Sequence, residues 1–274
     1  MKKGWIVTLV AIIVIAIVGV GVRHYLVSSK KDLSSAASSL PVQKLLEEAA
    51  QDEAQGEQLK AKRAYQQIIS EHPDYEKVEE IQNKLGDLNI KIIFSTEQTP
   101  QTVMYQVQPG DSLGKLAKQY HTTKELIQKS NGLKSDVIRV GQKLRIWNAP
   151  FSAAVNKSQN ILILKSGEEV IKTYRVATGK DNSTPAGMFR IATKIVNPVW
   201  YKAGSAPIPP ESPENELGSR WMGFEEDPHY GIHGTLHPEA IGGYDTAGCV
   251  RLTNPNVEEL FDFLPVGTQV VIQN

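Results

Sequence analysis

Hydrophobic and polar residues follow different periods along the chain, which begins with a continuous apolar run. Trp5 to Val22 is apolar apart from Thr8 and two glycines, and it follows Lys2-Lys3. A helix of this length rises roughly 27 Å, close to the thickness of a bilayer core. The run predicts a transmembrane anchor over residues 1–27, favoured over a cleaved signal because signal cores are shorter. The preceding lysines predict a single-pass protein of the cell membrane with its body outside the cytoplasm.

Helical periodicity dominates the next part of the chain. Residues 28–41 are rich in Ser and Ala and predict a tether, whereas residues 42–92 repeat apolar positions at three and four. The segment AKRAYQQIISEHPD resembles half of a tetratricopeptide repeat, but one such unit cannot bury a core alone. A helical hairpin stalk (TPR-like) is therefore favoured over a peptide-binding repeat. Residues 93–103 predict a linker.

Two further patterns separate the rest of the chain. Residues 104–147 show an alternating segment, two short helical segments and a second strand, which predicts a compact βααβ unit. Residues 151–274 contain several alternating runs and one helix that opens at Asn254-Pro255. This part predicts a mainly-β, β-sandwich-like domain of mixed strands. The proline-rich stretch from Gly204 to Pro213 predicts a loop.

Composition narrows the function classes. The 30 Lys and Arg balance the 30 Asp and Glu, so the overall charge gives no reason to expect nucleic acid as a partner. The single cysteine excludes an intramolecular disulfide and any multi-cysteine metal site. Residues 104–147 hold eight basic and three acidic residues, a surplus of five positive charges that suits an anionic partner.

The single cysteine, Cys249, lies in the sequence Thr246-Ala247-Gly248-Cys249-Val250-Arg251. Small residues before a thiol leave room for a substrate and let backbone N–H groups approach an oxyanion. His233, sixteen residues upstream, could accept the thiol proton. A small buried core residue is the alternative for a lone cysteine, and fast labelling at neutral pH is expected of a catalytic one.

A metal site is the competing explanation for the histidines. His229, His233 and His237 are spaced by four, as helical metal ligands are. Gly231, Gly234 and Pro238 oppose a helix there. On a strand, residues four apart lie roughly 13 Å from each other. The histidine spacing therefore does not predict a metal site.

The βααβ unit closely resembles a LysM domain in the segments YQVQPGDSLGKLAKQY, NGL and IRVGQKLRI. The resemblance implies binding of N-acetylglucosamine-containing glycans such as peptidoglycan. The implied groove residues are Gly110, Asp111, Ser112, Leu113, Asn131, Gly132 and Leu133. We expect removal of this unit to weaken peptidoglycan binding and to leave turnover of a small soluble peptide intact.

The C-terminal part resembles the YkuD-type L,D-transpeptidases in TPAGMFRI, LGSRWMGF and GIHGTLHPEAIGGYDTAGCVRL. The resemblance implies catalysis by Cys249 and His233, with Gly234 orienting the imidazole and Gly248 in the oxyanion hole. Arg251, Thr246 and Tyr230 are the expected substrate-binding residues. Ala247 stands where many members have His or Lys, at a variable position.

The implied reaction joins peptidoglycan stems through 3→3 cross-links, by way of a cysteine thioester and with release of D-alanine. The resemblance implies that it needs no metal or organic cofactor. L,D-carboxypeptidase activity and attachment of a protein to peptidoglycan are alternatives for the same site. A non-catalytic wall-binding protein, in which only the LysM unit acts, is the alternative from another class.

Overall fold

The structure is a computed structural model that describes residues 35–202 and 204–274. The predicted anchor over residues 1–27 lies outside these ranges. Within them, no helix combines the length and apolar character that crossing a membrane requires. The chain divides into two compact units, one ending at Val78 and one running from Glu79 to Asn274. Each is described by itself.

The first unit contains a helical hairpin, which begins at Ser35 within the predicted tether of residues 28–41 and ends at Glu71, before the end of the predicted stalk. Its helices are α2 (Ser35–Ala54) and α3 (Gln58–Glu71). Ala61, Tyr65 and Ile68 form the buried face of α3, and the Tyr65 hydroxyl donates a 2.7 Å hydrogen bond to Glu53 of α2. An apolar interface and a hydrogen bond between side chains therefore both hold the hairpin together.

The unit from Glu79 starts with most of α4 (Val78–Phe94), which packs against the C-terminal domain. Asn89 donates to the backbone carbonyl of Ile171 at 2.9 Å. Lys172 forms ion pairs of 2.8 Å with both Asp87 and Glu259. The sequence pattern groups this helix with the stalk of residues 42–92. The structure instead packs it on the C-terminal domain, because Ile90 and Ile93, on the apolar face of the helix, join the core of that domain.

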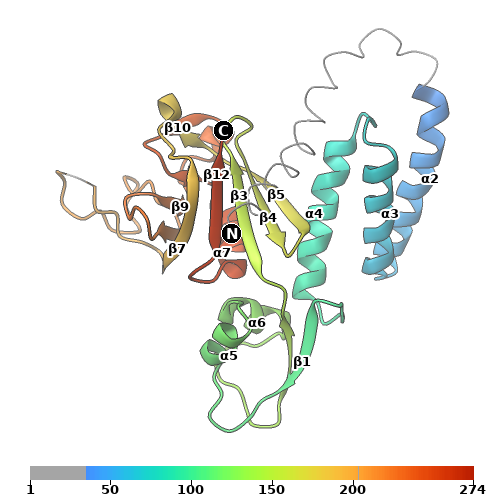
Figure 1. The fold of residues 1–274 in the computed structure, drawn as a ribbon, viewed down its shortest axis with the longest axis horizontal. Coiled ribbons are helices and arrows are strands. Elements are labelled where there is room, and N and C mark those ends of the chain that lie inside the picture. The colour runs from blue at the N-terminus through green and yellow to red at the C-terminus, as the bar shows by residue number, and fades with distance from the viewer. Residues whose placement is uncertain (1–34, 203) are drawn as a thin grey trace, which may run out of the picture. The chain divides into compact units, whose positions relative to one another are not determined.

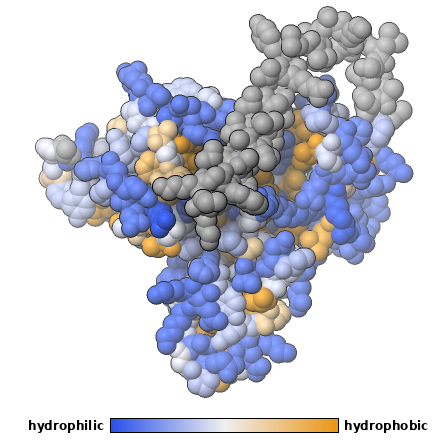
Figure 2. All heavy atoms as spheres, in the orientation of Figure 1, coloured by the Kyte–Doolittle hydropathy of each residue, from blue (hydrophilic) through white to orange (hydrophobic). Residues whose placement is uncertain are grey.

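The LysM-like segment has the predicted βααβ order. Its elements are β1 (Thr102–Gln106), α5 (Leu113–Gln119), α6 (Lys124–Ser130) and β2 (Lys143–Trp147). The two strands pair antiparallel, and Ser112 and Thr123 cap the helices by accepting backbone N–H bonds. Figure 2 shows the segment's face in view as mainly hydrophilic. Its large exposed apolar side chains are Met104, Val137 and Val140.

Polar contacts attach this segment to its neighbours in the same unit. Arg145 on β2 is only 3% exposed, and its guanidinium donates to the carbonyls of Ile92, Ile93 and Glu97 at 2.7–3.3 Å. It thereby satisfies carbonyls at the C-terminal end of α4, where a cation is favoured. Lys129 and Thr123 both contact Asp262, through its carboxylate and its backbone carbonyl respectively.

The C-terminal domain is built on a mixed eight-stranded sheet in the order β11-β9-β8-β7-β12-β3-β4-β5 (Figure 1). Its strands are β3 (Phe151–Asn156), β4 (Ile161–Ser166), β5 (Glu169–Arg175), β7 (Gly187–Val196), β8 (Arg220–Phe224), β9 (Gly231–His233), β11 (Val250–Arg251) and β12 (Gln269–Gln273). β6 (Thr178–Gly179) and β10 (Tyr244–Thr246) form a separate parallel pair. The prediction of a mainly-β domain with mixed strands is confirmed.

The long strand β7 joins the two halves of this sheet. Its first residues pair with β12, and Ile191 to Val196 pair with β8, with a register irregularity between Ile191 and Thr193. The two neighbours of β7 therefore pair with different parts of its length. The predicted helix, α7 (Asn254–Phe263), buries Leu260, Phe261 and Phe263 in the core. The loop from 197 to 219 between β7 and β8 contains the predicted proline-rich segment.

Candidate functional site

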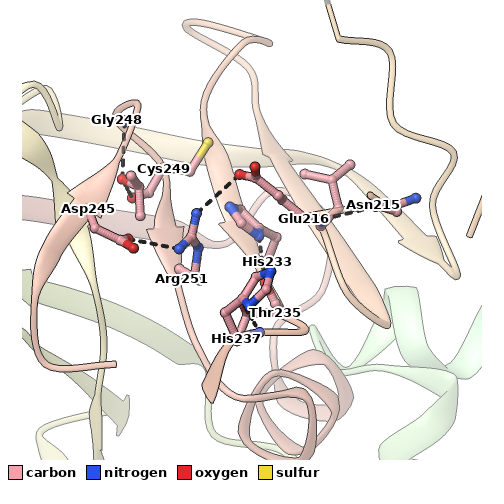
Figure 3. A network of polar contacts seen from close by, with 12 residues as sticks. Asn215, Glu216, His233, Thr235, His237, Asp245, Gly248, Cys249 and Arg251 are labelled. Carbon is pink, nitrogen blue, oxygen red and sulfur yellow. Dashed lines mark hydrogen bonds and ion pairs between the residues drawn. The ribbon is translucent and has the colours of Figure 1, made fainter. Parts of the chain in front are cut away.

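The candidate site lies where two short parallel strands meet. β9 and β11 pair so that His233 is opposite Arg251 and Ile232 is opposite Val250. Residues opposite each other on parallel strands face the same side, as do residues two apart on one strand. Cys249 immediately precedes β11, so the thiol lies at the start of the strand that pairs with the one carrying His233. Figure 3 shows the thiol, the guanidinium and the imidazole from these neighbouring segments.

His233 is buried, and its ring is fixed at one edge and on one face. Its Nδ1 lies 2.7 Å from the carbonyl oxygen of Gly234, so Nδ1 carries the proton and Nε2 is the free acceptor. Trp221, its direct cross-strand partner on β8, stacks on the imidazole with centroids 5.9 Å apart. Burial, followed by the nearby Arg251 charge, lowers the pKa of His233 to about 4. The imidazole is therefore neutral at physiological pH, as a general base must be.

Cys249 is half-buried, and its Sγ lies 3.8 Å from the carbonyl oxygen of His229. Burial raises the pKa of the thiol to about 11, although the Arg251 charge acts in the opposite direction. The resting site accordingly holds a neutral thiol beside a neutral imidazole. This arrangement suits proton transfer to His233 during attack on a substrate, in place of a preformed thiolate.

We expect alkylation of Cys249 by iodoacetamide to be slow at neutral pH and to rise about tenfold per pH unit until the pH approaches 11. Alkylation requires the thiolate, which burial disfavours. This expectation differs from the fast labelling at neutral pH that the sequence suggests for a catalytic cysteine. The chain has one cysteine, so the same thiol in the urea-unfolded chain is the control. It should react about 100-fold faster at pH 7, because a pKa near 9 replaces one near 11. A rate that is already constant between pH 7 and 9 would contradict the shifted pKa.

The turn before Cys249 depends on Thr246 and Gly248. The buried Thr246 hydroxyl donates to the Cys249 carbonyl at 2.7 Å and accepts from the Gly248 N–H at 3.2 Å. The Thr246 hydroxyl thus stabilises the turn, a structural role that differs from the predicted role in binding substrate. Gly248 has φ +136°, and a Cβ there would overlap the ring of Tyr230. Tyr230 therefore forms a wall of the site directly over this glycine.

Arg251 is engaged by two carboxylates of the chain itself. Its side chain is 7% exposed, and it pairs with Asp245 at 2.8 Å and with Glu216 at 3.4 Å (Figure 3). Within the described residues, its Nε is buried and has no hydrogen-bond partner. The guanidinium therefore connects β11 to the loop between β7 and β8, and its charge is largely balanced before any substrate carboxylate arrives.

A pocket of about 570 Å³ lies beside this ion pair. The loop between β7 and β8 supplies most of its wall, including Glu216, and His237 completes it. The site therefore adjoins an open volume on the Glu216 side of Arg251.

The three histidines differ in burial and in their partners. His229 is exposed and pairs with Asp227 at 3.0 Å, and His237 is exposed and lies 3.3 Å from Glu239. His233 alone is buried. In the described ranges, no group of three or more His, Cys, Asp or Glu side chains has the arrangement of a metal site.

The predicted glycan-binding residues divide between turns and core. Gly110 and Gly132 have positive φ and form the turns, and Ser112 caps α5. The other polar members are engaged inside the segment, and Leu113 is buried at 1% exposed. Asp111 accepts from Tyr105 and the Gln108 N–H, Asn131 exchanges hydrogen bonds with the backbone of Arg145, and Leu133 packs on the segment's core. These contacts shape the loops on which a glycan groove would depend.

Sequence reasoning missed Trp221, Glu216, Asp245 and Asn254. A signal was available only for Trp221, since alternation along RWMGF places it on one face of a strand. The carboxylates that pair with Arg251 and the contacts of Asn254 depend on residues brought together from distant parts of the chain.

A thiol just before β11 and an imidazole at the end of the neighbouring β9 are the residue types that nucleophilic catalysis uses. Residues 150–272 match the family model of the L,D-transpeptidase catalytic domain, YkuD, and residues 105–147 match that of the LysM domain. The chain belongs to the YkuD family of L,D-transpeptidases.

Curated relatives agree with this assignment. The putative L,D-transpeptidase YqjB of Bacillus subtilis is 42% identical over 43% of this chain and 68% of its own length. The putative L,D-transpeptidase YkuD of Bacillus licheniformis is 33% identical over 62% of this chain and 98% of its own length. A solved structure, an L,D-transpeptidase from Mycobacterium smegmatis, is 20% identical, with a TM-score of 0.38 over 50% of this chain and 65% of that one.

Proposed function

We propose that the protein is a peptidoglycan L,D-transpeptidase that forms 3→3 cross-links through a thioester on Cys249. The donor is a tetrapeptide stem, and the reacting bond joins its third residue to the terminal D-alanine. The acceptor is the side-chain amine of a diamino acid on another stem. The observation that supports this proposal is the pairing of β9 with β11, in which His233 is opposite Arg251, two residues after Cys249.

In the first half-reaction, the Cys249 sulfur attacks the carbonyl carbon of the third stem residue. His233 Nε2 takes the thiol proton and delivers it to the departing nitrogen of D-alanine, so a C–S bond replaces the C–N bond. The Cys249 N–H is the proposed oxyanion donor. The Gly248 N–H could join it only by giving up its bond to Thr246.

In the second half-reaction, the acceptor amine attacks the thioester and a new amide forms. His233 removes the proton from the amine nitrogen and returns it to the departing sulfur, which restores the neutral pair. Water in place of the amine would give the L,D-carboxypeptidase reaction. An amine from a protein lysine would instead attach that protein to the wall.

The LysM domain and the predicted anchor give this reaction a location. We propose that the LysM domain holds glycan strands of peptidoglycan, with the surplus positive charge of residues 104–147 favouring the anionic wall. The apolar run that follows Lys2-Lys3 supports attachment to the cell membrane with the catalytic domain outside the cytoplasm.

The direct test is mass spectrometry of products after incubation of the protein with purified disaccharide-tetrapeptide. A dimer that has lost one D-alanine supports transpeptidation. Tripeptide product supports the carboxypeptidase, and a lysine-bearing acceptor protein that gains a stem supports attachment. Unchanged tetrapeptide, together with sedimentation of the protein with insoluble peptidoglycan, would favour a wall-binding protein without catalysis.

A further inference from the structure

Asn254, the first residue of α7, reaches two backbone segments that border His233. Its Oδ1 accepts the Thr235 N–H at 3.1 Å and the Ser219 N–H at 3.0 Å. Thr235 follows the end of β9, and Ser219 immediately precedes β8. One amide oxygen therefore joins the ends of two paired strands to the start of a helix that is distant in the sequence.

The Thr235 N–H belongs to the same peptide group as the Gly234 carbonyl. That group is planar and trans, so its N–H and its C=O point in opposite directions. The Gly234 carbonyl is the oxygen that holds His233 Nδ1 at 2.7 Å. When Asn254 fixes the N–H at one edge of this peptide, it fixes the direction of the carbonyl at the other edge.

We propose that Asn254 is a positioning residue for His233, acting through the Gly234–Thr235 peptide. The hydrogen bonds run in one direction, from the imidazole Nδ1–H to the Gly234 carbonyl and from the Thr235 N–H to Asn254 Oδ1. Each bond polarises the next. The chain of contacts keeps the proton on Nδ1 and leaves Nε2 as the acceptor, the state that the proposed function requires of the base.

The packing around the amide shows why this arrangement is rigid. A Cβ at Gly234 or at Gly218 would overlap Asn254 Oδ1. The two glycines thus leave room for the amide, and any side chain in their place would displace it. The N-cap of α7 is a separate contact, in which the Asn256 N–H donates to Thr253 Oγ1, so Asn254 is not needed to cap the helix.

The test compares Asn254→Ala with Asn254→Asp in the full chain. Asp keeps an acceptor oxygen of the same geometry, whereas Ala removes it. Asn256→Ala, in the same helical turn, controls for loss of an asparagine from α7. We expect Asn254→Ala to lower kcat for tetrapeptide conversion by about 10–100-fold, part of the 10²–10⁴-fold that a general base contributes, with KM nearly unchanged. We expect Asn254→Asp and Asn256→Ala to stay within about threefold of the parent chain.

A second readout does not depend on turnover. Nitrogen NMR of the ¹⁵N-histidine-labelled chain should show Nδ1 protonated in the parent and a mixture of tautomers in Asn254→Ala; His233 is assigned by its loss in His233→Ala. Unchanged tautomers in Asn254→Ala would overturn the proposal, whatever happens to kcat. So would full kcat in that variant, or a loss that Asn254→Asp does not restore. An inactive parent chain would refute the proposed function instead, and the tautomer comparison would still decide the role of Asn254.

Discussion

Cys249→Ala should abolish acyl-enzyme formation while leaving the fold intact. The side chain is half-buried, and alanine is smaller, so no overlap arises. Cys249→Ser should be equally inactive, because a serine hydroxyl titrates far above a thiol and resists activation by the same imidazole. His233→Ala should lower the rate of acylation by about 10²–10⁴-fold, the usual contribution of a general base. Intact-mass analysis with the tetrapeptide donor, or with a carbapenem as substrate mimic, measures the adduct on the parent and on each variant.

His72→Ala is the control for the histidine substitution. His72 ends α3 in the first unit, outside the catalytic domain, so its loss should change acylation little. Thermal melting of each variant separates loss of chemistry from loss of structure. Full transfer activity in Cys249→Ala would refute the thioester mechanism outright.

The elements of the C-terminal domain could be predicted from local patterns. The strands β7 and β8 coincide with the runs GMFRIATKIV and RWMGF, and α7 begins at the predicted Asn254-Pro255. Period-two alternation and proline at a helix start are local signals, and they need no knowledge of distant contacts. Cys249 and His233 could also be proposed from the sequence, because the types of these residues and of their neighbours in the motif indicate nucleophilic chemistry.

The environment of the pair could not be predicted in the same way. Arg251 has no local partner that would mark it as an ion-pair residue: Asp245 lies six residues away and Glu216 thirty-five. Because Arg251 already pairs with these two carboxylates, a structural role explains it more directly than binding of a substrate carboxylate does. Asn254 is likewise nineteen residues from Thr235 and thirty-five from Ser219. Such contacts follow from the parallel register of β9 and β11 and the docking of α7, which alternation alone does not specify.

The link between the LysM domain and the catalytic domain also depends on non-local contacts. The sequence predicts two separable domains, because a linker-like segment precedes the first and each has its own hydrophobic pattern. The structure buries Leu126 of α6 and Trp147 of β2 in the core of the catalytic domain. It also places the guanidinium of Arg145 on the carbonyls that end α4. α4 in turn contributes Ile90 and Ile93 to that core.

Deletion of residues 104–147 should therefore lower both peptidoglycan binding and turnover of a small soluble tetrapeptide. Turnover falls because the deletion exposes apolar core surface and leaves Asp262 without Lys129, so less of the chain stays folded. Chemical denaturation and tetrapeptide conversion, measured on the same preparations, test this. Retained turnover and an unchanged unfolding midpoint would show that the domains are independent, as the sequence pattern first indicated.

Arg145→Ala isolates the contact from the loss of the whole domain. Two carbonyls in the last turn of α4, and that of Glu97 just beyond it, would lose the guanidinium as a donor. We expect the free energy of unfolding to fall by about 2–4 kcal/mol. Lys143→Ala, at an exposed position of the same strand, is the control and should change stability by less than about 0.5 kcal/mol. Because the predicted groove residues lie in the loops before α5 and after α6, Arg145→Ala should retain peptidoglycan binding under conditions where it is still folded. A stability loss in Arg145→Ala no larger than in Lys143→Ala would mean that the buried guanidinium is not what joins the LysM domain to α4.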